Sequence, residues 1–168
     1  YHNSINGYHA AKLRRFQEYY DYLSLHDNEK LFNSLNVKYL IAKDENNEDQ
    51  LYQNPDALGN AWSVDSLITV DTADELLIKL KDTDISKVAL SINNSIPSSI
   101  SKEYNSGDLV KIEKTKISSS HITYEFESLS DQLIVFSEIY YPSGWEVYID
   151  DVKSEYFDVN YILRGMVV

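Results

Sequence analysis

Residues 136–150, FSEIYYPSGWEVYID, limit the possible fold more than any other part of the sequence. A Tyr-Tyr-Pro and a Gly stand there between two strand-like runs, a pattern typical of a turn between strands. The first run, residues 133–141, begins apolar on both faces, which predicts a central strand. In the second run Trp145, Val147 and Ile149 share one face, which we expect to point into the core. The stretch therefore predicts the core of a β domain.

The strand pattern extends over the whole C-terminal part of the chain. Apolar and polar residues alternate in residues 110–113 and again in residues 121–126, with three serines between them that predict a hairpin turn. Asp150 and Asp151 predict another turn, and residues 161–168 predict a last strand. About six short strands at this spacing favour an antiparallel β-sandwich, jelly-roll-like in type, over residues 109–168.

The first part of the chain has helical as well as strand patterns. Apolar residues at helical spacing predict a helix over residues 10–23, and Asp27 or Asn28 is a suitable cap for a second, short helix. A buried strand is expected at residues 37–42. The polar stretch of residues 43–53 predicts a surface loop or a hairpin tip.

Residues 61–92 predict a strand, a helix and a second strand. The strand is expected at residues 61–70 and the helix from residue 73 to about 80. Thr72 and Glu75 form a capping box, in which we expect the Glu75 carboxylate to reach back to the Thr72 amide.

The resulting fold class is α+β, divided into two parts. N-terminal helices with a small mixed α/β subdomain are expected over residues 1–108, and the antiparallel sandwich over residues 109–168. Residues 95–108, which are rich in Ser, Pro and Gly, form the predicted connection.

Charge and composition exclude several classes of function. With 15 basic and 27 acidic residues the net charge is −12, so a phosphate backbone is repelled and no nucleic-acid partner is expected. The chain has no cysteine, and no apolar run approaches the roughly 18 residues of a membrane span. The abrupt start at Tyr1 and the stop within a strand-like run at Val168 indicate an excised, C-terminally truncated fragment.

No motif predicts catalysis. The sequence lacks a Gly-x-Ser-x-Gly elbow and a His-x-x-x-His zinc pair, so we expect no catalytic residue, no metal and no cofactor. Four carboxylates lie close in sequence, and a pair of carboxylates can hydrolyse a glycoside. They are Glu138, Glu146, Asp150 and Asp151.

Aromatic and basic residues supply the candidate contacts for a ligand or polymer. The 14 tyrosines include the pair Tyr140 and Tyr141, and alternation turns Tyr140 and Tyr148 outward. Such rings stack on half-polar ligands such as sugars, although they also close the edges of small cores. A basic stripe at three-residue spacing follows the first helix. The full set of candidates is His9, Lys12, Arg15, Trp62, Tyr140, Tyr141 and Tyr148.

Four ordered blocks resemble the YfhO-like family of bacterial polytopic membrane proteins, which are glycosyltransferase-like. The blocks are GYHAAKLRR at residues 7–15, LNVKYLI at residues 35–41, NPDALGNAW at residues 54–62, and FSEIYYPSGWEVYID at residues 136–150 together with VNYILRG at residues 159–165. Two departures concern the C-terminal strands. The family has Asp-Gly where this chain has Asp150-Asp151, and its pattern continues past Val168 to another strand.

The resemblance implies an extracytoplasmic, non-catalytic domain at the outer face of the bacterial cytoplasmic membrane. Its partners are then the membrane-embedded remainder of the same chain and a glycan or envelope polymer that is glycosylated there. Two alternatives stay open at this point. One is a structural or protein-interaction module that caps a membrane bundle, and the other is a soluble glycosidase-like enzyme.

Overall fold

The chain forms two compact units in a computed structural model that describes residues 4–5 and 12–168. The first unit covers Tyr1–Gly59 and the second Asn60–Val168. Together they are mixed α+β with mostly antiparallel strands, which confirms the predicted fold class at this level. None of the helices in the described residues is long and apolar enough to cross a lipid bilayer.

The first unit begins with two helices, α1 (Arg14–His26) and α2 (Asn28–Ser34). Asp27 caps α2 because its carboxylate accepts the Lys30 amide at 2.9 Å. The buried hydroxyls of Tyr19 and Ser34 lie 2.7 Å apart, joining the two helices. A short buried hydrogen bond of this kind fixes the helices relative to each other.

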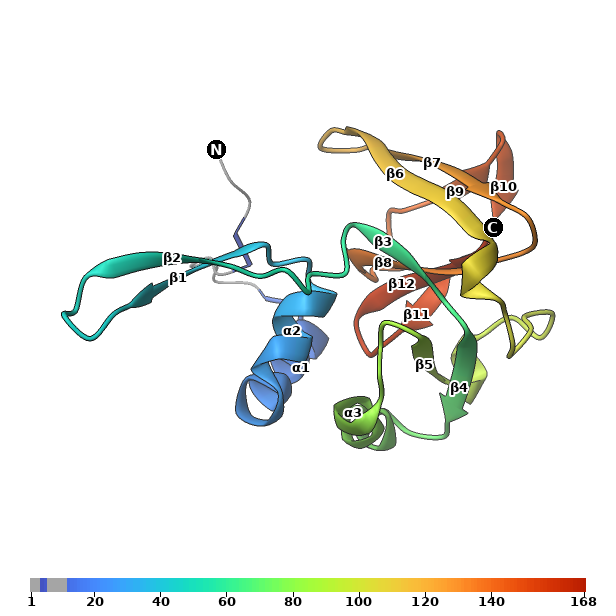
Figure 1. Cartoon of the computed structure of the whole chain (residues 1–168). Helices are drawn as coiled ribbons and strands as arrows, with labels where there is room; N and C mark the ends of the chain where they lie inside the picture. The colour runs from blue at the N-terminus through green and yellow to red at the C-terminus, as the bar shows by residue number, and fades with distance from the viewer. Residues whose placement is uncertain (1–3, 6–11) are drawn as a thin grey trace. The chain divides into compact units, whose positions relative to one another are not determined.

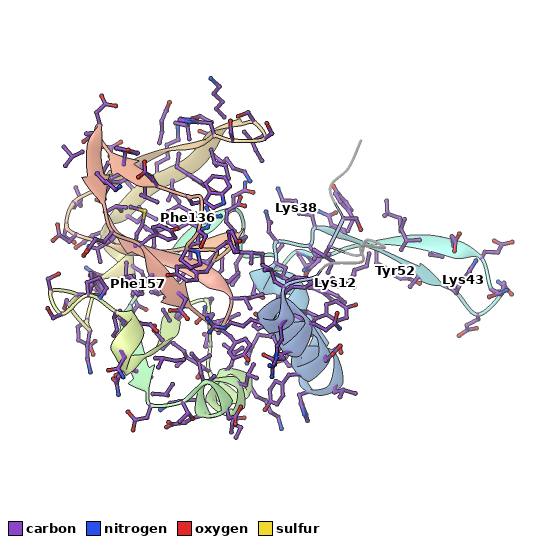
Figure 2. The ribbon with its side chains drawn as sticks, turned by 180° about the vertical axis from the view of Figure 1, so that it is seen from behind. Lys12, Lys38, Lys43, Tyr52, Phe136 and Phe157 are labelled. Atoms are coloured by element: carbon purple, nitrogen blue, oxygen red, sulfur yellow. The ribbon has the colours of Figure 1, made fainter. Side chains whose placement is uncertain are left out.

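A two-stranded hairpin, β1 (Tyr39–Lys43) and β2 (Asp49–Gln53), completes the first unit. Asp44 closes its tip, because the carboxylate accepts the amides of Asn46 at 2.8 Å and Glu48 at 2.9 Å. Residues 44–48 are therefore the hairpin tip, whereas residues 49–53 of the predicted polar loop form strand β2. Figure 2 shows Tyr52 and Lys43 along this hairpin.

The second unit is built on a four-stranded antiparallel sheet in the order β11–β12–β8–β3. Its strands are β3 (Ala61–Val64), β8 (Leu133–Ile139), β11 (Phe157–Val159) and β12 (Leu163–Val167). β8 lies between β12 and β3, and Leu133 to Phe136 are all buried, as expected for a central strand.

The two faces of this sheet carry different layers (Figure 1). One face packs against a parallel pair, β4 (Ser66–Val70) and β5 (Val88–Ile92), and the helix α3 (Ala73–Asp82). The other packs against two hairpins. They are β6 (Leu109–Ile117) with β7 (Ile122–Ser128), and β9 (Val147–Ile149) with β10 (Val152–Ser154).

Phe136 and Phe157, labelled in Figure 2, belong to opposite faces of the sheet. Phe136 forms a core with Ile134 and Met166 under the two hairpins, and its ring centre lies 4.9 Å from that of Tyr124. Phe157 is 2% exposed and lies beside Gly165 on the other face. The sheet is thus covered on both sides.

This arrangement differs from the predicted jelly-roll sandwich. The sheets are small and not closed, and the parallel β4–β5 pair belongs to the same unit as the C-terminal strands. The expected boundary at residues 95–108 therefore differs from the one between the units, at Gly59. The reason is that β3 pairs with β8, over Ala61–Phe136 to Val64–Leu133, which ties the early strand to the late ones.

The strand expected at residues 61–70 is two strands that break at Asp65. Its amide donates to Lys87 O at 2.7 Å, and its carboxylate accepts the Ser106 amide at 3.1 Å. These bonds redirect the chain from the four-stranded sheet into the parallel pair. The alternation of apolar and polar residues does not predict this change of layer, because both strands have the same pattern.

Local sequence signals for α3 and the late turns are confirmed. Thr72 Oγ1 accepts the Glu75 amide at 3.2 Å, although Glu75 reaches back to the Asp71 amide rather than to that of Thr72. Asp150 and Asp151 form the two-residue turn between β9 and β10 with φ of 48° and 65°. Both lie in the left-handed region that a type I′ hairpin requires.

Candidate functional site

An aromatic cluster lies where the chain leaves β8, formed by Tyr140, Tyr141, Trp145, Tyr156 and Arg164. The rings of Tyr140 and Tyr156 have centres 5.5 Å apart and are tilted by 60°. The Arg164 guanidinium lies 4.4 Å from the centre of the Trp145 ring, within cation–π range. Tyr141 is 46% exposed, so the cluster offers a ring to solvent.

Hydrogen bonds hold the loop of residues 140–146 that carries this cluster. The Tyr156 hydroxyl donates to the carbonyls of Tyr141 at 3.2 Å and Trp145 at 3.4 Å. Arg164 Nε donates to Ile139 O at 3.1 Å, and the Tyr140 amide donates to Ile162 O at 2.7 Å. The loop has no regular secondary structure, but its backbone is fixed at both ends.

Charged groups lie near Arg164 of the cluster. Glu138 pairs with Lys114 at 3.3 Å, and both side chains are mostly buried. Burial raises the pKa of the Tyr124 hydroxyl, and the nearby Glu138 carboxylate raises it further. Burial lowers the pKa of Arg164, which Glu138 opposes, so the guanidinium stays charged. The charges of Glu138, Lys114 and Arg164 therefore compensate one another next to the cluster.

The exposure of the candidate residues in this region differs in part from what the sequence predicts. Tyr140, expected to point outward, is half-buried against Tyr156, and its neighbour Tyr141 is the exposed ring instead. Tyr148 is 55% exposed on β9, and its hydroxyl donates to Glu146 at 2.9 Å. Trp145, expected in the core, is only half-buried, and the Arg164 guanidinium covers one face of its ring.

Trp62, one of the candidate contacts, is a core residue. Only 8% of it is exposed, and its indole Nε1 donates to Ile85 O at 2.9 Å. The strand pattern around Trp62 predicts a strand but not the burial of its indole, because the same pattern fits a sheet covered on one face or on both.

The basic stripe is not assembled in the described residues. His9 lies outside them, Lys12 is exposed and precedes α1, and Arg15 is half-buried in the first turn of α1. The helix was expected from residue 10, but its described start is Arg14. Among these candidates only Arg15 is therefore placed on the helix.

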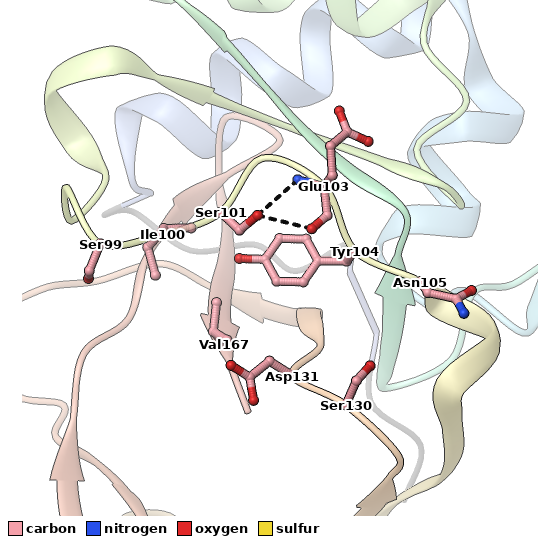
Figure 3. A pocket seen from close by; sticks show the side chains of 9 residues that line it. All are labelled: Ser99, Ile100, Ser101, Glu103, Tyr104, Asn105, Ser130, Asp131 and Val167. Carbon is pink, nitrogen blue, oxygen red and sulfur yellow. Dashed lines mark hydrogen bonds between the residues drawn. The ribbon is translucent and has the colours of Figure 1, made fainter.

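A second feature, which we call the Tyr104 cleft, lies elsewhere in the second unit (Figure 3). It has a volume of about 680 Å³ and is open to solvent. Its walls are the loop of residues 99–105, the loop of residues 130–131 and the end of β12. The lining residues are Ser99, Ile100, Ser101, Glu103, Tyr104, Asn105, Ser130, Asp131 and Val167.

Figure 3 shows the Tyr104 ring in the middle of the cleft, with Asp131 and Val167 facing it. The Glu103 carboxylate points away from both. Burial raises the pKa of the Tyr104 hydroxyl, a hydrogen bond from the Ser101 backbone opposes this, and the Asp131 charge raises it again. Asp131 is therefore close enough to the ring to act on it electrostatically.

Asp65 fixes the first wall of the cleft. Its carbonyl accepts the Tyr104 amide at 2.8 Å, and its carboxylate accepts both the amide and the hydroxyl of Ser106. Hydrogen bonds from Ser106 hold the pKa of Asp65 below its usual range. An ionised Asp65 thus ties the loop of residues 99–105 to the junction of β3 and β4.

Gln132 fixes the second wall. It is fully buried, and its Nε2 donates to the carbonyls of Ser130 at 3.4 Å and Asp131 at 3.1 Å, and to the Ser130 hydroxyl at 3.1 Å. Its backbone pairs in both directions with Val168. The loop that carries Asp131 is therefore held by a buried side chain.

Sequence reasoning missed the Tyr104 cleft. Residues 95–108 were interpreted as a connection, and Tyr104 and Asp131 stand 27 positions apart with no shared motif. The one available signal was an isolated tyrosine in a stretch of small polar residues. The fold brings the two loops together through the pairing of β3 with β8, because Asp65, which binds the Tyr104 loop, directly follows the Val64–Leu133 pair, and no local pattern specifies this pairing.

The geometry does not favour glycoside hydrolysis. Glu103 and Asp131 both line the cleft, but Figure 3 shows that their carboxylates do not face each other, as an acid and a base or nucleophile must. Of the four carboxylates close in sequence, Glu138 pairs with Lys114 and Glu146 with Lys153.

No protein-family model, no curated protein and no solved structure matches this chain.

Proposed function

We propose that this chain is an extracytoplasmic, non-catalytic module of a YfhO-like, glycosyltransferase-like membrane protein, and that it contacts the glycan acceptor. The aromatic cluster carries the contact part of this proposal. Tyr141 presents an exposed ring on a loop that Tyr156 and Arg164 hold in place, so little conformational entropy is lost on binding. The family and its location rest on the four sequence blocks.

Chemical-shift mapping with a neutral oligosaccharide tests the contact. On addition of a millimolar N-acetylglucosamine tetramer, we expect the amides of residues 139–146 to shift. Tyr141→Ala removes the exposed ring and should reduce these shifts several-fold. Tyr39→Ala, which removes a tyrosine that is 58% exposed in the first unit, is the matched control. Shifts that are absent, or unchanged by Tyr141→Ala, contradict the proposal.

The apolar surface of the β1–β2 hairpin favours a second candidate function. Ile41 and Leu51 are paired across the hairpin and are 74% and 66% exposed. Exposed apolar side chains gathered on one element are typical of an interaction surface. We propose as the alternative that this hairpin contacts the membrane-embedded remainder of the protein.

Binding to zwitterionic detergent micelles tests this alternative. We expect the amides of residues 39–53 to shift with micelles, and Ile41→Ser with Leu51→Ser to abolish the shifts. A Val110→Ser variant, which removes an apolar residue that is 58% exposed in the second unit, should change nothing. A hairpin spectrum that does not respond to micelles contradicts the alternative.

A further inference from the structure

We propose that the Tyr104 cleft is a binding subsite for an amine-bearing sugar unit, such as a hexosamine with a free amino group. The proposal deepens that of glycan contact, on which it rests, but it concerns a different place. The cleft lies at the start of β8 and the aromatic cluster at its end. A seven-residue strand separates them by roughly 20 Å.

The shape of the cleft fits a single sugar ring. The half-buried Tyr104 ring forms a flat wall, and Val167 adds an apolar surface opposite to it. The C–H face of a pyranose packs on such rings, while its rim needs polar partners. Serine hydroxyls and the Asn105 amide line the same cleft and supply them.

The charge of the cleft selects the kind of sugar. Asp131 faces the Tyr104 ring, and the described lining residues include no Lys, Arg or His. The neighbouring Lys102 is directed elsewhere, because its Nζ donates to Thr69 Oγ1 at 3.3 Å. A sugar acid would therefore meet an uncompensated carboxylate, whereas an ammonium group would form a charge-assisted hydrogen bond with Asp131.

Hydrogen bonds hold both walls of the cleft in place, so the cleft can distinguish an amine-bearing sugar from a sugar acid. Asp65 holds the Tyr104 loop and the buried Gln132 holds the Asp131 loop, so ring and carboxylate keep their relative positions before a ligand arrives. A preformed site loses less entropy on binding than a mobile loop. The Ser130 hydroxyl at the rim is held in position as well, since its Oγ donates to Asp108 at 2.8 Å.

The test compares three tetrasaccharides on the 168-residue chain by chemical-shift titration: glucosamine, N-acetylglucosamine and galacturonic acid. We expect the glucosamine tetramer to shift the amides of residues 99–105 and 130–132. Its affinity should exceed that of the N-acetylated tetramer by about tenfold, which is the effect of one charge-assisted hydrogen bond. The galacturonic acid tetramer should not shift them.

Two matched variants, Asp131→Asn and Glu155→Gln, distinguish binding of the amine at this site from the general attraction of a cationic sugar to a protein of net charge −12. Each variant removes one exposed carboxylate from the second unit. Asp131→Asn should abolish the preference for the free amine, and Glu155→Gln should preserve it. Tyr104→Ala, with its fold checked from the dispersion of the amide spectrum, should weaken glucosamine binding about 3- to 10-fold.

Equal affinity for the glucosamine and N-acetylglucosamine tetramers overturns the proposal, as does an equal effect of Asp131→Asn and Glu155→Gln. Absence of shifts at residues 99–105 with every probe also overturns it. The two proposals fail separately, because the proposed function is read from residues 139–146 and the subsite from residues 99–105 and 130–132.

Discussion

At the scale of single residues, Gly165 stands where β12 has no room for a side chain. An added Cβ would lie 2.7 Å from Val159 Cγ1 and 3.4 Å from Phe157 Cε2, both on the neighbouring strand β11. We predict that Gly165→Ala lowers the free energy of unfolding by about 1–3 kcal/mol, because it overpacks a closed core. Urea denaturation measures the change.

A double-mutant cycle with Val159→Ala checks the cause of this loss. Val159→Ala alone leaves a cavity and is expected to destabilise the second unit, but it also removes the two Cγ atoms nearest to the new methyl group. The double variant should therefore be more stable than the sum of the single effects predicts. Strict additivity would show that Gly165→Ala acts in another way.

Asn160 combines an unusual backbone conformation with a buried hydrogen bond. Its φ is 49°, its Oδ1 accepts the Leu90 amide at 2.9 Å, and its own amide donates to Leu90 O at 2.7 Å. We predict that Asn160→Ala costs about 2–4 kcal/mol, since it strains the backbone and leaves the Leu90 amide without its acceptor.

Asn160→Gly separates these two effects. Glycine adopts the positive φ freely but supplies no acceptor, so about 1 kcal/mol of the loss should be recovered in thermal or chemical unfolding. If Asn160→Gly and Asn160→Ala are equally unstable, the backbone conformation contributes nothing and the hydrogen bond accounts for the whole effect.

At the scale of elements, Asp65 joins three segments: the end of β3, the start of β4 and the loop of the Tyr104 cleft. Its folded-state pKa is lowered, so its contribution to stability is complete above the unfolded-state pKa of about 4 and is lost as the pH falls through the folded-state value. We predict that Asp65→Asn is less stable than the wild type at pH 7 and loses less stability on acidification.

Unfolding curves measured between pH 7 and pH 2 test this dependence, with Glu155→Gln as the control that removes an exposed carboxylate. Ser106→Ala provides an independent check, because loss of its hydroxyl should raise the pKa of Asp65 in a carboxyl carbon titration. Parallel pH profiles for Asp65→Asn and wild type would contradict the assignment.

Elements with local signals were predictable from the sequence. Thr72 and Glu75 predict the start of α3, and the alternation in residues 110–126 predicts β6 and β7. The break at Asp65 was not predictable, since its cause is a hydrogen bond to Ser106, 41 residues away. The burial of Trp62 and Tyr140 was not predictable either, because it depends on layers that distant segments of the chain contribute.

The site was predictable only in part for a related reason. Alternation correctly predicts the exposed Tyr148, and the Tyr-Tyr-Pro pattern marks the end of β8, but it does not predict that Tyr141 rather than Tyr140 is the exposed ring. The Tyr104 cleft is not predictable in this way, because Tyr104 and Asp131 meet only after β3 and β8 have paired and Gln132 has been buried. Tertiary pairing, not local propensity, decides where these side chains lie.

At the scale of the whole molecule, the boundary between the two compact units predicts which fragments of the chain fold alone. All strands of the four-stranded sheet come from residues 61–167. We predict that residues 60–168 fold alone and keep the amide spectrum that their core has in the whole chain. Residues 109–168 should not fold, because they lack β3 and the β4–β5 layer and leave Leu133 to Val135 exposed.

Amide spectra of the two fragments decide this prediction. A dispersed spectrum for residues 109–168 would support the boundary inferred from composition, and a collapsed spectrum for residues 60–168 would contradict independent folding. The comparison is matched, because both fragments contain β6 to β12 and differ only in the segment that supplies β3, β4, α3 and β5.

The pairing of β3 with β8 also determines when the sheet can form during synthesis. A ribosome that has just made Val64 must add 69 more residues before Leu133, its partner, appears, and β12 follows later still. At about 5–20 residues per second the nascent β3 waits several seconds without its sheet. Meanwhile α3 and the β4–β5 pair can form from adjacent sequence, so they give the emerging chain its first folded surface.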